Sequence, residues 1–228
     1  GTNLNAISAS NLCKVYQNGK KALTNLSIEV QEGEIFSLLG PNGAGKSTLI
    51  NILTTFLQPT SGKILIMGKD LYAEQKSIRS LISCVAQNVS IDNHLSLREN
   101  MLFQGRLYKL DKPTANKRMD ALITAFDLRE YEKNRVTAYS GGIKRRLDIA
   151  MSMMSYPKIL FLDEPTVGMD IESRQAMWDV VKKIKADFGT TILLTTHYLE
   201  EADMLSDTVC IMQDGHELVQ DTPENLRQ

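Results

Sequence analysis

The sequence predicts an α/β protein built around a mostly parallel sheet. Short apolar runs of strand length alternate with segments of helical spacing along most of the 228 residues. A glycine-rich loop at residues 40–45 stands between one such run and the expected start of a helix. Because neighbouring parallel strands need a crossover connection, which is usually a helix, this alternation favours strands that run in one direction.

Composition and charge are those of an ordinary folded protein. Hydrophobic residues make up 43% of the chain and charged residues 23%, which is typical of globular domains. The 26 basic and 27 acidic residues nearly cancel, so charge gives no general attraction to nucleic acid or to an anionic membrane. Three widely separated cysteines favour free thiols in a reducing compartment over disulfides: Cys13, Cys84 and Cys210.

The apolar pattern predicts the first elements in order. Residues 6–30 alternate weakly, and the apolar run 35–39 predicts a strand that leads into the glycine-rich loop. A helix should begin near Lys46 and end at the turn formers of residues 59–62. Its expected buried face consists of Leu49, Ile52, Leu53 and Phe56. Another strand is expected at residues 63–67.

The remaining elements follow from a change in composition near residue 90. Residues 90–155 are rich in Leu, Arg, Lys, Met and Ala, with few strand formers, which predicts a helical insertion. Strands are then expected at residues 159–162 and 191–195, with a helix over residues 171–188 between them. Asp214-Gly215 predicts the turn of a final hairpin. No apolar run approaches the roughly 20 residues that span a bilayer, so any membrane role would come through a partner.

The glycine-rich loop reads Gly-Pro-Asn-Gly-Ala-Gly-Lys-Ser over residues 40–47 and fits the phosphate-loop pattern GxxxxGK[ST]. Glycines allow successive backbone N–H groups to turn toward phosphate oxygens, and a helix N-terminus adds partial positive charge. Lys46 would supply a charge to the β- and γ-phosphates, and Ser47 a hydroxyl to Mg²⁺. The alternative is a plain glycine turn that enters a helix, which the strand–loop–helix context disfavours.

Two carboxylates end the strand at residues 159–162. Ligands of α/β sheets lie beyond the carboxyl ends of strands, where the phosphate loop also lies. Asp163 would then hold Mg²⁺, and Glu164 would orient or deprotonate an attacking water. A solvated Asp-Glu-Pro turn is the alternative, and it is weak once the phosphate loop is considered.

A second anion site is expected where Ser140-Gly141-Gly142 introduces a helix. Ser140 can cap this helix, and the two glycines expose backbone donors at its positive end. Two phosphate-binding helix starts in one chain suggest that two copies share a nucleotide. The basic run Lys144-Arg145-Arg146 is expected to be a solvated helix face near this site, in preference to a nucleic-acid contact.

These motifs together resemble the nucleotide-binding subunits of ATP-binding-cassette (ABC) transporters. They stand in that family's order: Tyr16, the phosphate loop, Gln87, Ser140-Gly141-Gly142, Asp163-Glu164, Gly168-Met169-Asp170 and His197. The resemblance implies ATP as substrate and Mg²⁺ as cofactor. It also implies one ABC ATPase domain over residues 1–228, with a RecA-like P-loop NTPase core, an N-terminal antiparallel β sub-domain and a helical sub-domain at about residues 90–155.

The resemblance implies a role for each matching residue at the nucleotide. Tyr16 would stack on adenine. The phosphates would be held by Gly40, Pro41, Asn42, Gly43, Ala44, Gly45, Lys46, Ser47 and Thr48. The Mg²⁺ ligands would be Ser47, Gln87 and Asp163.

The resemblance also implies residues for catalysis and for the contact between two cassettes. Glu164 would act as the general base, His197 would contact the γ-phosphate, and Lys46 would stabilise its charge. Gln87 would report the nucleotide state to a membrane partner. On the opposite cassette, the γ-phosphate would be bound by Ser140, Gly141 and Gly142, with Asp170 at the interface. One departure is Ile143, which stands where the family usually has Gln; it puts only a minor contact in doubt.

Finer features resemble the drug-resistance and antibiotic-export cassettes, which include the daunorubicin-resistance type. They lie at residues 97–100, 105–108, 139–147 and 195–203. The resemblance implies an ATPase that powers export through transmembrane permease subunits, pairs with a second cassette, and sits in the cytoplasm on the inner face of the cell membrane.

Three alternatives stay open at this point. They are an importer cassette, a mechanochemical ABC ATPase without transport, and a regulatory subunit with little catalysis. The transported substrate and the identity of the second cassette also stay open. So does a C-terminal extension beyond Gln228, which cassettes of the drug-export type often have.

Overall fold

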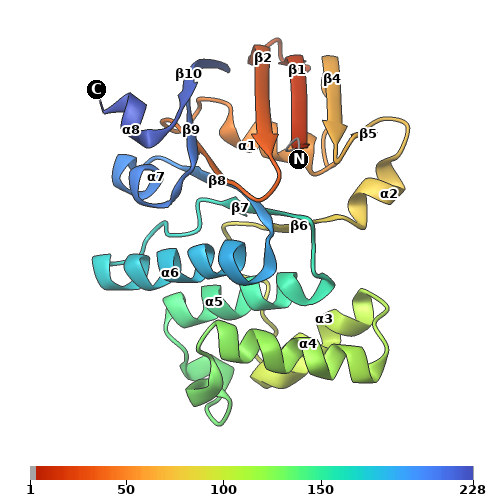
Figure 1. The fold of residues 1–228 in the computed structure, drawn as a ribbon, viewed down its shortest axis with the longest axis vertical. Coiled ribbons are helices and arrows are strands. Elements are labelled where there is room, and N and C mark those ends of the chain that lie inside the picture. Colours follow the sequence, from red (N-terminus) through yellow and green to blue (C-terminus); the bar gives the residue numbers. More distant parts are fainter. Residues whose placement is uncertain (1–3, 228) are drawn as a thin grey trace.

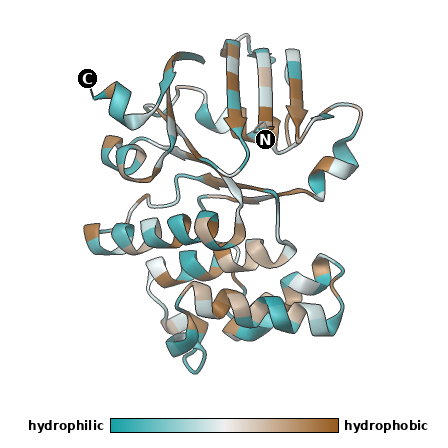
Figure 2. Ribbon diagram, viewed as in Figure 1, coloured by the Kyte–Doolittle hydropathy of each residue, from teal (hydrophilic) through white to brown (hydrophobic). Residues whose placement is uncertain are grey.

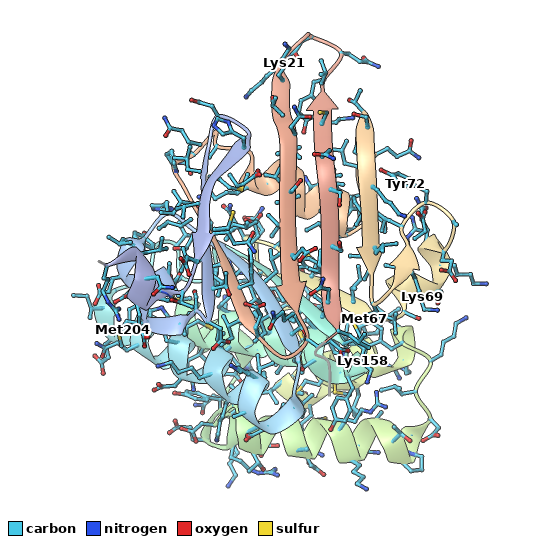
Figure 3. All side chains as sticks on the ribbon, turned by 45° about the horizontal axis from the view of Figure 1, so that its top comes forward. Lys21, Met67, Lys69, Tyr72, Lys158 and Met204 are labelled. Carbon is cyan, nitrogen blue, oxygen red and sulfur yellow. The ribbon has the colours of Figure 1, made fainter. Side chains whose placement is uncertain are left out.

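The computed structural model describes residues 4–227, so the two ends of the expected domain, residues 1–3 and 228, lie outside the described residues. Two β-sheets and a set of helices make up the chain (Figure 1). The antiparallel sheet has the order β2-β1-β4-β5, with β1 at Asn5–Val15, β2 at Lys21–Gln31, β4 at Ser61–Ile66 and β5 at Lys69–Asp70. Figure 3 labels Lys21 and Met67 at opposite ends of this sheet.

The second sheet carries the parallel strands. Its order is β10-β9-β3-β8-β7-β6, and every neighbouring pair from β9 to β6 is parallel, whereas β10 pairs with β9 in the antiparallel sense. Its strands are β3 Ile35–Leu39, β6 Ile82–Val85, β7 Ile159–Asp163, β8 Thr191–Thr196, β9 Thr208–Gln213 and β10 His216–Asp221. The predicted α/β fold class is confirmed, as is the final hairpin.

The α-helices are α1 Lys46–Leu53, α2 Gln75–Arg79, α3 Leu97–Leu107, α4 Lys112–Ala125, α5 Gly141–Ser152, α6 Ile171–Phe188, α7 Leu199–Leu205 and α8 Pro223–Leu226. Short 3-10 turns lie at Arg129–Tyr131, Val136–Ala138 and Met153–Ser155. Residues 90–155, all of which the structure describes, contain helices and turns but no strand. The expected helical character of this region is confirmed.

Alternate residues of the parallel strands face two different cores. On β7, Leu160 and Leu162 pack with the helical side of the molecule, in a cluster that includes Val181 of α6. Ile159 and Phe161 pack on the other face, in a cluster that includes α1 and the antiparallel sheet. A strand buried on both faces must be apolar throughout, which explains the continuous run Ile-Leu-Phe-Leu. The amphipathic helices α4 and α6, by contrast, are striped along their length in Figure 2.

Local signals set the ends of the longest helix. Asp170 is the N-cap of α6, and its carboxylate accepts a 2.7 Å hydrogen bond from the N–H of Ser173. Gly189 ends the helix in the left-handed conformation at φ 65°, which a glycine adopts without a steric penalty. The predicted bounds of this helix, residues 171–188, are therefore confirmed.

Two expectations for α1 were wrong: its end at residues 59–62, since the helix stops at Leu53, and one position of its buried face. Leu49, Ile52 and Leu53 are buried, but α1 ends at Leu53 and Phe56 is 80% exposed. The chain leaves the helix because Thr55 adopts a left-handed conformation with φ 72°. Phe56 then turns away from the core, although its spacing continues the apolar pattern of the helix.

Substitutions at these two kinds of position should differ in their effect on stability. Ile52→Ala should lower the free energy of unfolding by about 2–5 kcal/mol, because it leaves a cavity in the core. Phe56→Ala should change it by no more than about 0.5 kcal/mol, because the ring is exposed. Urea denaturation of both variants measures the difference. Equal losses would contradict the placement of Phe56 outside the core.

Candidate functional site

Four loops meet at the carboxyl edge of the parallel sheet. The hydrogen-bonded register aligns Leu39 of β3 with Thr196 of β8, and Asp163 of β7 with Thr195. Strand β6 ends beside β7 and leads directly to residue 87. Segments that are far apart in the sequence are thereby brought to one edge of the sheet. They contain the phosphate loop, Asp163-Glu164, His197 and Gln87.

The phosphate loop requires glycine at positions where the backbone is strained or crowded. Gly45 has a φ of 105°, and a Cβ there would lie 2.9 Å from the carbonyl oxygen of Ala22. A Cβ at Gly40 would lie 2.5 Å from the carbonyl oxygen of Met212. Any larger residue would therefore displace the backbone of a neighbouring segment. Helix α1 begins directly after the loop, at Lys46.

Lys46 is the buried cation of the site. Its side chain donates from Nζ to the carbonyl oxygen of Gly40 at 2.5 Å and to that of Thr196 at 3.2 Å. It also lies 3.3 Å from Oε1 of Glu164, and the lysine residue is 5% exposed. A buried charge needs such partners to offset its lost hydration. The ammonium group is thereby held beside the loop that would carry the phosphates.

Glu164 is the centre of the polar contacts. Besides Lys46, its carboxylate accepts a 3.2 Å hydrogen bond from Nε2 of Gln87 and lies 3.1 Å from Nδ1 of His197. Its own N–H donates to Oγ1 of Thr195 at 2.9 Å, and that hydroxyl donates to Asp163 at 2.8 Å. Glu164 also adopts a left-handed conformation with φ 45°. A strained backbone of this kind persists only where the surroundings hold it.

Opposing effects act on the Glu164 carboxyl group. Burial alone would raise its pKa, but the contacts with His197 and Lys46 outweigh burial and bring the pKa below its ordinary value of 4.5. The side chain is therefore a carboxylate at neutral pH, which is the form that can accept a proton or orient a water.

Lys46, Gln87 and Glu164 border a cleft of about 220 Å³, which His197 does not line. Part of its wall comes from Tyr16 and Lys20, in the turn between β1 and β2, and the hydroxyl of Tyr16 lies 3.0 Å from that of Thr48. The cleft is lined by Tyr16, Lys20, Ala22, Asn42, Gly43, Gly45, Lys46, Ser47, Thr48, Gln87, Asp163 and Glu164. Gly40, Pro41 and Ala44 belong to the loop without lining the cleft.

Two contributors to the site were missed by the sequence analysis. Lys20 adds a positive charge to the wall beside Tyr16. Thr195 joins the two acidic residues through its hydroxyl. The signal for Thr195 was its position at the end of a predicted strand two residues before His197. Its contact with β7 depends on which strands are neighbours, which the sequence did not reveal.

Two of the remaining predicted residues, Ser140 and Gly142, line a separate hollow of about 170 Å³, whereas Gly141 and Asp170 do not line it. Its lining includes Ser140, Gly142 and Ser173, and it shares none of its lining residues with the cleft. Ser140 caps α5, because its hydroxyl accepts a 3.2 Å hydrogen bond from the N–H of Ile143. Asp170 caps the adjacent helix α6, and Gly141 is exposed. Within one chain, Ser140-Gly141-Gly142 therefore stays apart from Lys46.

The oxygen-bearing residues fit a magnesium ion bound together with a nucleotide. Ser47 is exposed at the start of α1, and Asp163 borders the same cleft. Hydroxyl and carboxylate oxygens are ligands that Mg²⁺ prefers, with phosphate oxygens and waters completing its shell. Residues 4–227 contain no cluster of three or more His, Cys, Asp or Glu side chains that could hold a metal by itself. Within the same residues, no helix combines the length and apolar character needed to cross a membrane.

Residues 23–167 match the ABC transporter family. The chain belongs to this family. It is 43% identical over 97% of its length to the doxorubicin resistance ATP-binding protein DrrA of Mycobacterium tuberculosis (strain ATCC 25618 / H37Rv), and 42% identical over 97% to the daunorubicin/doxorubicin resistance ATP-binding protein DrrA of Streptomyces peucetius. It covers 67% of each of these relatives.

Solved cassettes have the same fold. The cbiO1 subunit of the cbiONQ transporter complex of Clostridium perfringens superposes with a TM-score of 0.92 at 27% identity, over 98% of this chain and 90% of that one. A dimeric cassette in a post-hydrolysis state with ADP and phosphate gives 0.81 at 25% identity, over 95% and 98%. The predicted resemblance to drug-resistance cassettes and the expected fold are confirmed. The chain is an ATP-binding ATPase of the ABC type.

Acid should remove a specific contribution of Glu164 to stability. A carboxyl whose folded pKa lies below its unfolded value stabilises the fold above the unfolded pKa, near 4.5 here, and loses this effect as the pH falls through the folded value. The free energy of unfolding of the wild type relative to Glu164→Gln should therefore decrease as the pH falls below 4.5. Urea titrations between neutral and acidic pH measure this difference. A difference that is independent of pH would contradict the lowered pKa.

Proposed function

We propose that the chain is one of two cassettes that close on Mg-ATP and drive export through transmembrane permease subunits. The observation that carries this proposal is the separation of the two anion sites. The cleft of Lys46 and Glu164 lacks the Ser140-Gly141-Gly142 segment, which borders a different hollow of the same chain. A second chain would supply that segment to the nucleotide, so that each site is shared between two copies.

The geometry supports a role for each residue of the cleft. The N–H groups of residues 43–47 and Lys46 would bind the β- and γ-phosphates, and Tyr16 would stack on the adenine ring. Ser47, Asp163 and Gln87 would hold Mg²⁺, which neutralises phosphate charge. Glu164 would orient the attacking water and accept its proton.

The other contacts of Glu164 hold its carboxylate in place next to the proposed position of the attacking water. His197 and Gln87 both approach its carboxylate, and both could shift their contact toward a phosphate or a water. Thr195 holds the backbone of Glu164 next to Asp163. The base and the metal ligand would thereby keep a constant relation to each other.

The second cassette would bring Ser140 and the N-terminus of α5 to the γ-phosphate. Helix α5 has 12 residues and begins at Gly141, so its free N–H groups present partial positive charge. Asp170 lies on α6 beside this segment and would face the interface. The similarity to a solved cassette dimer supports this arrangement.

A groove next to the Gln87 loop supports a permease partner. It has a volume of about 450 Å³ and is bordered by Phe56, Cys84 and Tyr108. Phe56 is 80% exposed there, and an exposed aromatic ring in an apolar groove is typical of a protein–protein contact. A permease segment in this groove would lie beside Ala86 and so would sense the position of Gln87. The chain would thereby sit on the cytoplasmic face of the membrane.

The relatives favour export of a drug-like molecule over import. Two are described as doxorubicin or daunorubicin resistance proteins, and another, from Rhizobium johnstonii, as a Nod factor export protein. A mechanochemical role on nucleic acid is disfavoured by the net charge of −1. A purely regulatory role is disfavoured because Glu164 contacts Lys46, Gln87 and His197, the residues expected to act in hydrolysis. We also propose that the whole chain forms one cassette, with residues 90–155 as its helical sub-domain.

Glu164→Gln should trap a dimer with ATP. Loss of the general base should slow turnover by about 10²–10⁴-fold, equivalent to about 3–5 kcal/mol of barrier, while ATP still binds. Size-exclusion chromatography with light scattering should show a shift from monomer to dimer only with Mg-ATP. The matched control is Lys46→Ala in the same background, which should stay monomeric. A monomer that has bound ATP would contradict the shared site, and unchanged turnover would contradict the role of Glu164.

If the chain powers export, inside-out vesicles should transport the drug from the medium into their lumen. Vesicles that contain the chain with its permease should accumulate daunorubicin in their lumen when ATP is added outside. Vesicles with Glu164→Gln should not, although they contain the same amount of both proteins. ATP-dependent loss of preloaded drug from the vesicles would indicate an importer instead.

A further inference from the structure

Arg145 is buried, contrary to the expectation that Lys144-Arg145-Arg146 forms a solvated face. It lies on α5 and is 6% exposed. Its guanidinium group donates from Nη1 to the carbonyl oxygen of Ala86 and from Nη2 to that of Gln87. The planar fork of an arginine can make two such bonds at once, which the single ammonium group of lysine does less well.

Asp148, one helical turn later, holds the same segment of chain. Its Oδ2 lies 3.8 Å from Nη1 of Arg145, and its Oδ1 accepts a 3.3 Å hydrogen bond from the N–H of Ser90. Asp148 is 5% exposed. Burial raises the pKa of its carboxyl group, and the Ser90 N–H and Arg145 act against that rise. Two charged side chains of one helix thus hold residues 86–90 at three backbone groups.

Burying two charges is costly unless each is fully paired. An apolar pair of similar volume would fill this position at less cost in desolvation. Instead, Arg145 and Asp148 form hydrogen bonds with backbone atoms of a single segment, which contains Gln87. All five residues of this segment, from Ala86 to Ser90, are exposed, so packing contributes little to its position.

The segment contacts the proposed catalytic carboxylate, Glu164, through the side chain of Gln87. The side chain of Gln87 donates from Nε2 to Oε2 of Glu164 at 3.2 Å. At the other end of the contact, α5 begins at the Ser140 cap. Arg145 follows Gly141, the first residue of α5, by four positions, which is about 6 Å along the helix axis. Helix α5 therefore connects the hollow around Ser140 to the nucleotide cleft through Arg145, the backbone of Gln87 and the Gln87 side chain.

We propose that Arg145, paired with Asp148, is a positioning residue that fixes Gln87 against Glu164 and makes the place of Gln87 follow that of α5. The inference rests on the proposed role of Gln87 at the nucleotide. Movement of α5 toward a second cassette would carry residues 86–90 with it, because Arg145 and Asp148 bond to their backbone. The state of the interface would thereby reach the catalytic carboxylate within one chain.

The experiment uses variants of the complete chain that keep its charges balanced. Arg145→Met/Asp148→Leu removes both charges together and so leaves no unpaired buried charge. Arg145→Lys keeps the pair with Asp148 but loses the fork. The matched control is Arg118→Met, because Arg118 also joins helical elements by a hydrogen bond to a carbonyl, that of Met154 at 2.9 Å, without touching residues 86–90. Gln87→Ala, alone and combined with the Arg145 variants, tests the route through Gln87.

The readouts are hydrogen exchange of residues 86–90 and the kcat and KM of Mg-ATP hydrolysis. Arg145→Met/Asp148→Leu should speed exchange in this segment and lower kcat about 10–100-fold, with KM nearly unchanged. Arg145→Lys should fall between it and the wild type, and Arg118→Met should change neither readout. Adding Gln87→Ala to Arg145→Met/Asp148→Leu should lower kcat no further than Gln87→Ala alone does.

Other results would distinguish a failure of the proposed role of Gln87 from a failure of the positioning role of Arg145. If Gln87→Ala leaves kcat unchanged, the proposed role of Gln87 is wrong and the inference about Arg145 falls with it. If Gln87→Ala lowers kcat but the Arg145 effects multiply with it, Arg145 acts on general stability and only the present inference is overturned. Unchanged exchange at residues 86–90 in Arg145→Met/Asp148→Leu would overturn it as well.

Discussion

The hydrogen-bonded register of β3, β8, β7 and β6 places four loops level with one another, and the nucleotide site depends on it. Leu39 pairs with Thr196, and Asp163 with Thr195, so the phosphate loop, the acidic strand end and His197 converge. A slip of one residue in any pair would turn the strand's side chains to the opposite face. Both faces of this sheet are packed with apolar side chains, and this burial resists such a slip.

The converging loops form a site in which polar groups depend on one another. Lys46 and Glu164 are both buried and lie 3.3 Å apart. Either charge alone would be costly in this position, because burial removes its hydration. The left-handed backbone of Glu164 is a local strain that the surrounding hydrogen bonds maintain. Strain of this kind is typical of functional sites, where local preference yields to the geometry that the chemistry needs.

Helix α5 is the element through which the proposed second cassette would act on this site. Ser140 caps its N-terminus. In its second turn, the buried Arg145 donates a hydrogen bond to the carbonyl oxygen of Gln87. The helix thus lines the hollow around Ser140 directly, and it reaches the nucleotide cleft only through its contact with Gln87. The groove around Phe56 is bordered by Ala86, the residue before Gln87, so the proposed permease contact would touch the same segment.

The sequence by itself determined the fold class, the order of the main strands and helices and the residue types of the site. The phosphate loop and the Asp163-Glu164 strand end are local patterns, and local patterns survive in any tertiary context. The roles of Thr195 and Arg145 were decided only by the tertiary structure. Thr195 reads as an ordinary strand residue and Arg145 as part of a basic surface run until β7 and the 86–90 segment are placed beside them. Phe56 shows the same limit, because the helical period of its neighbours could not reveal that the chain turns at Thr55. Which strands are adjacent, and which side of a helix is covered, depend on packing between segments distant in sequence, and spacing along the chain does not encode these contacts in a readable form.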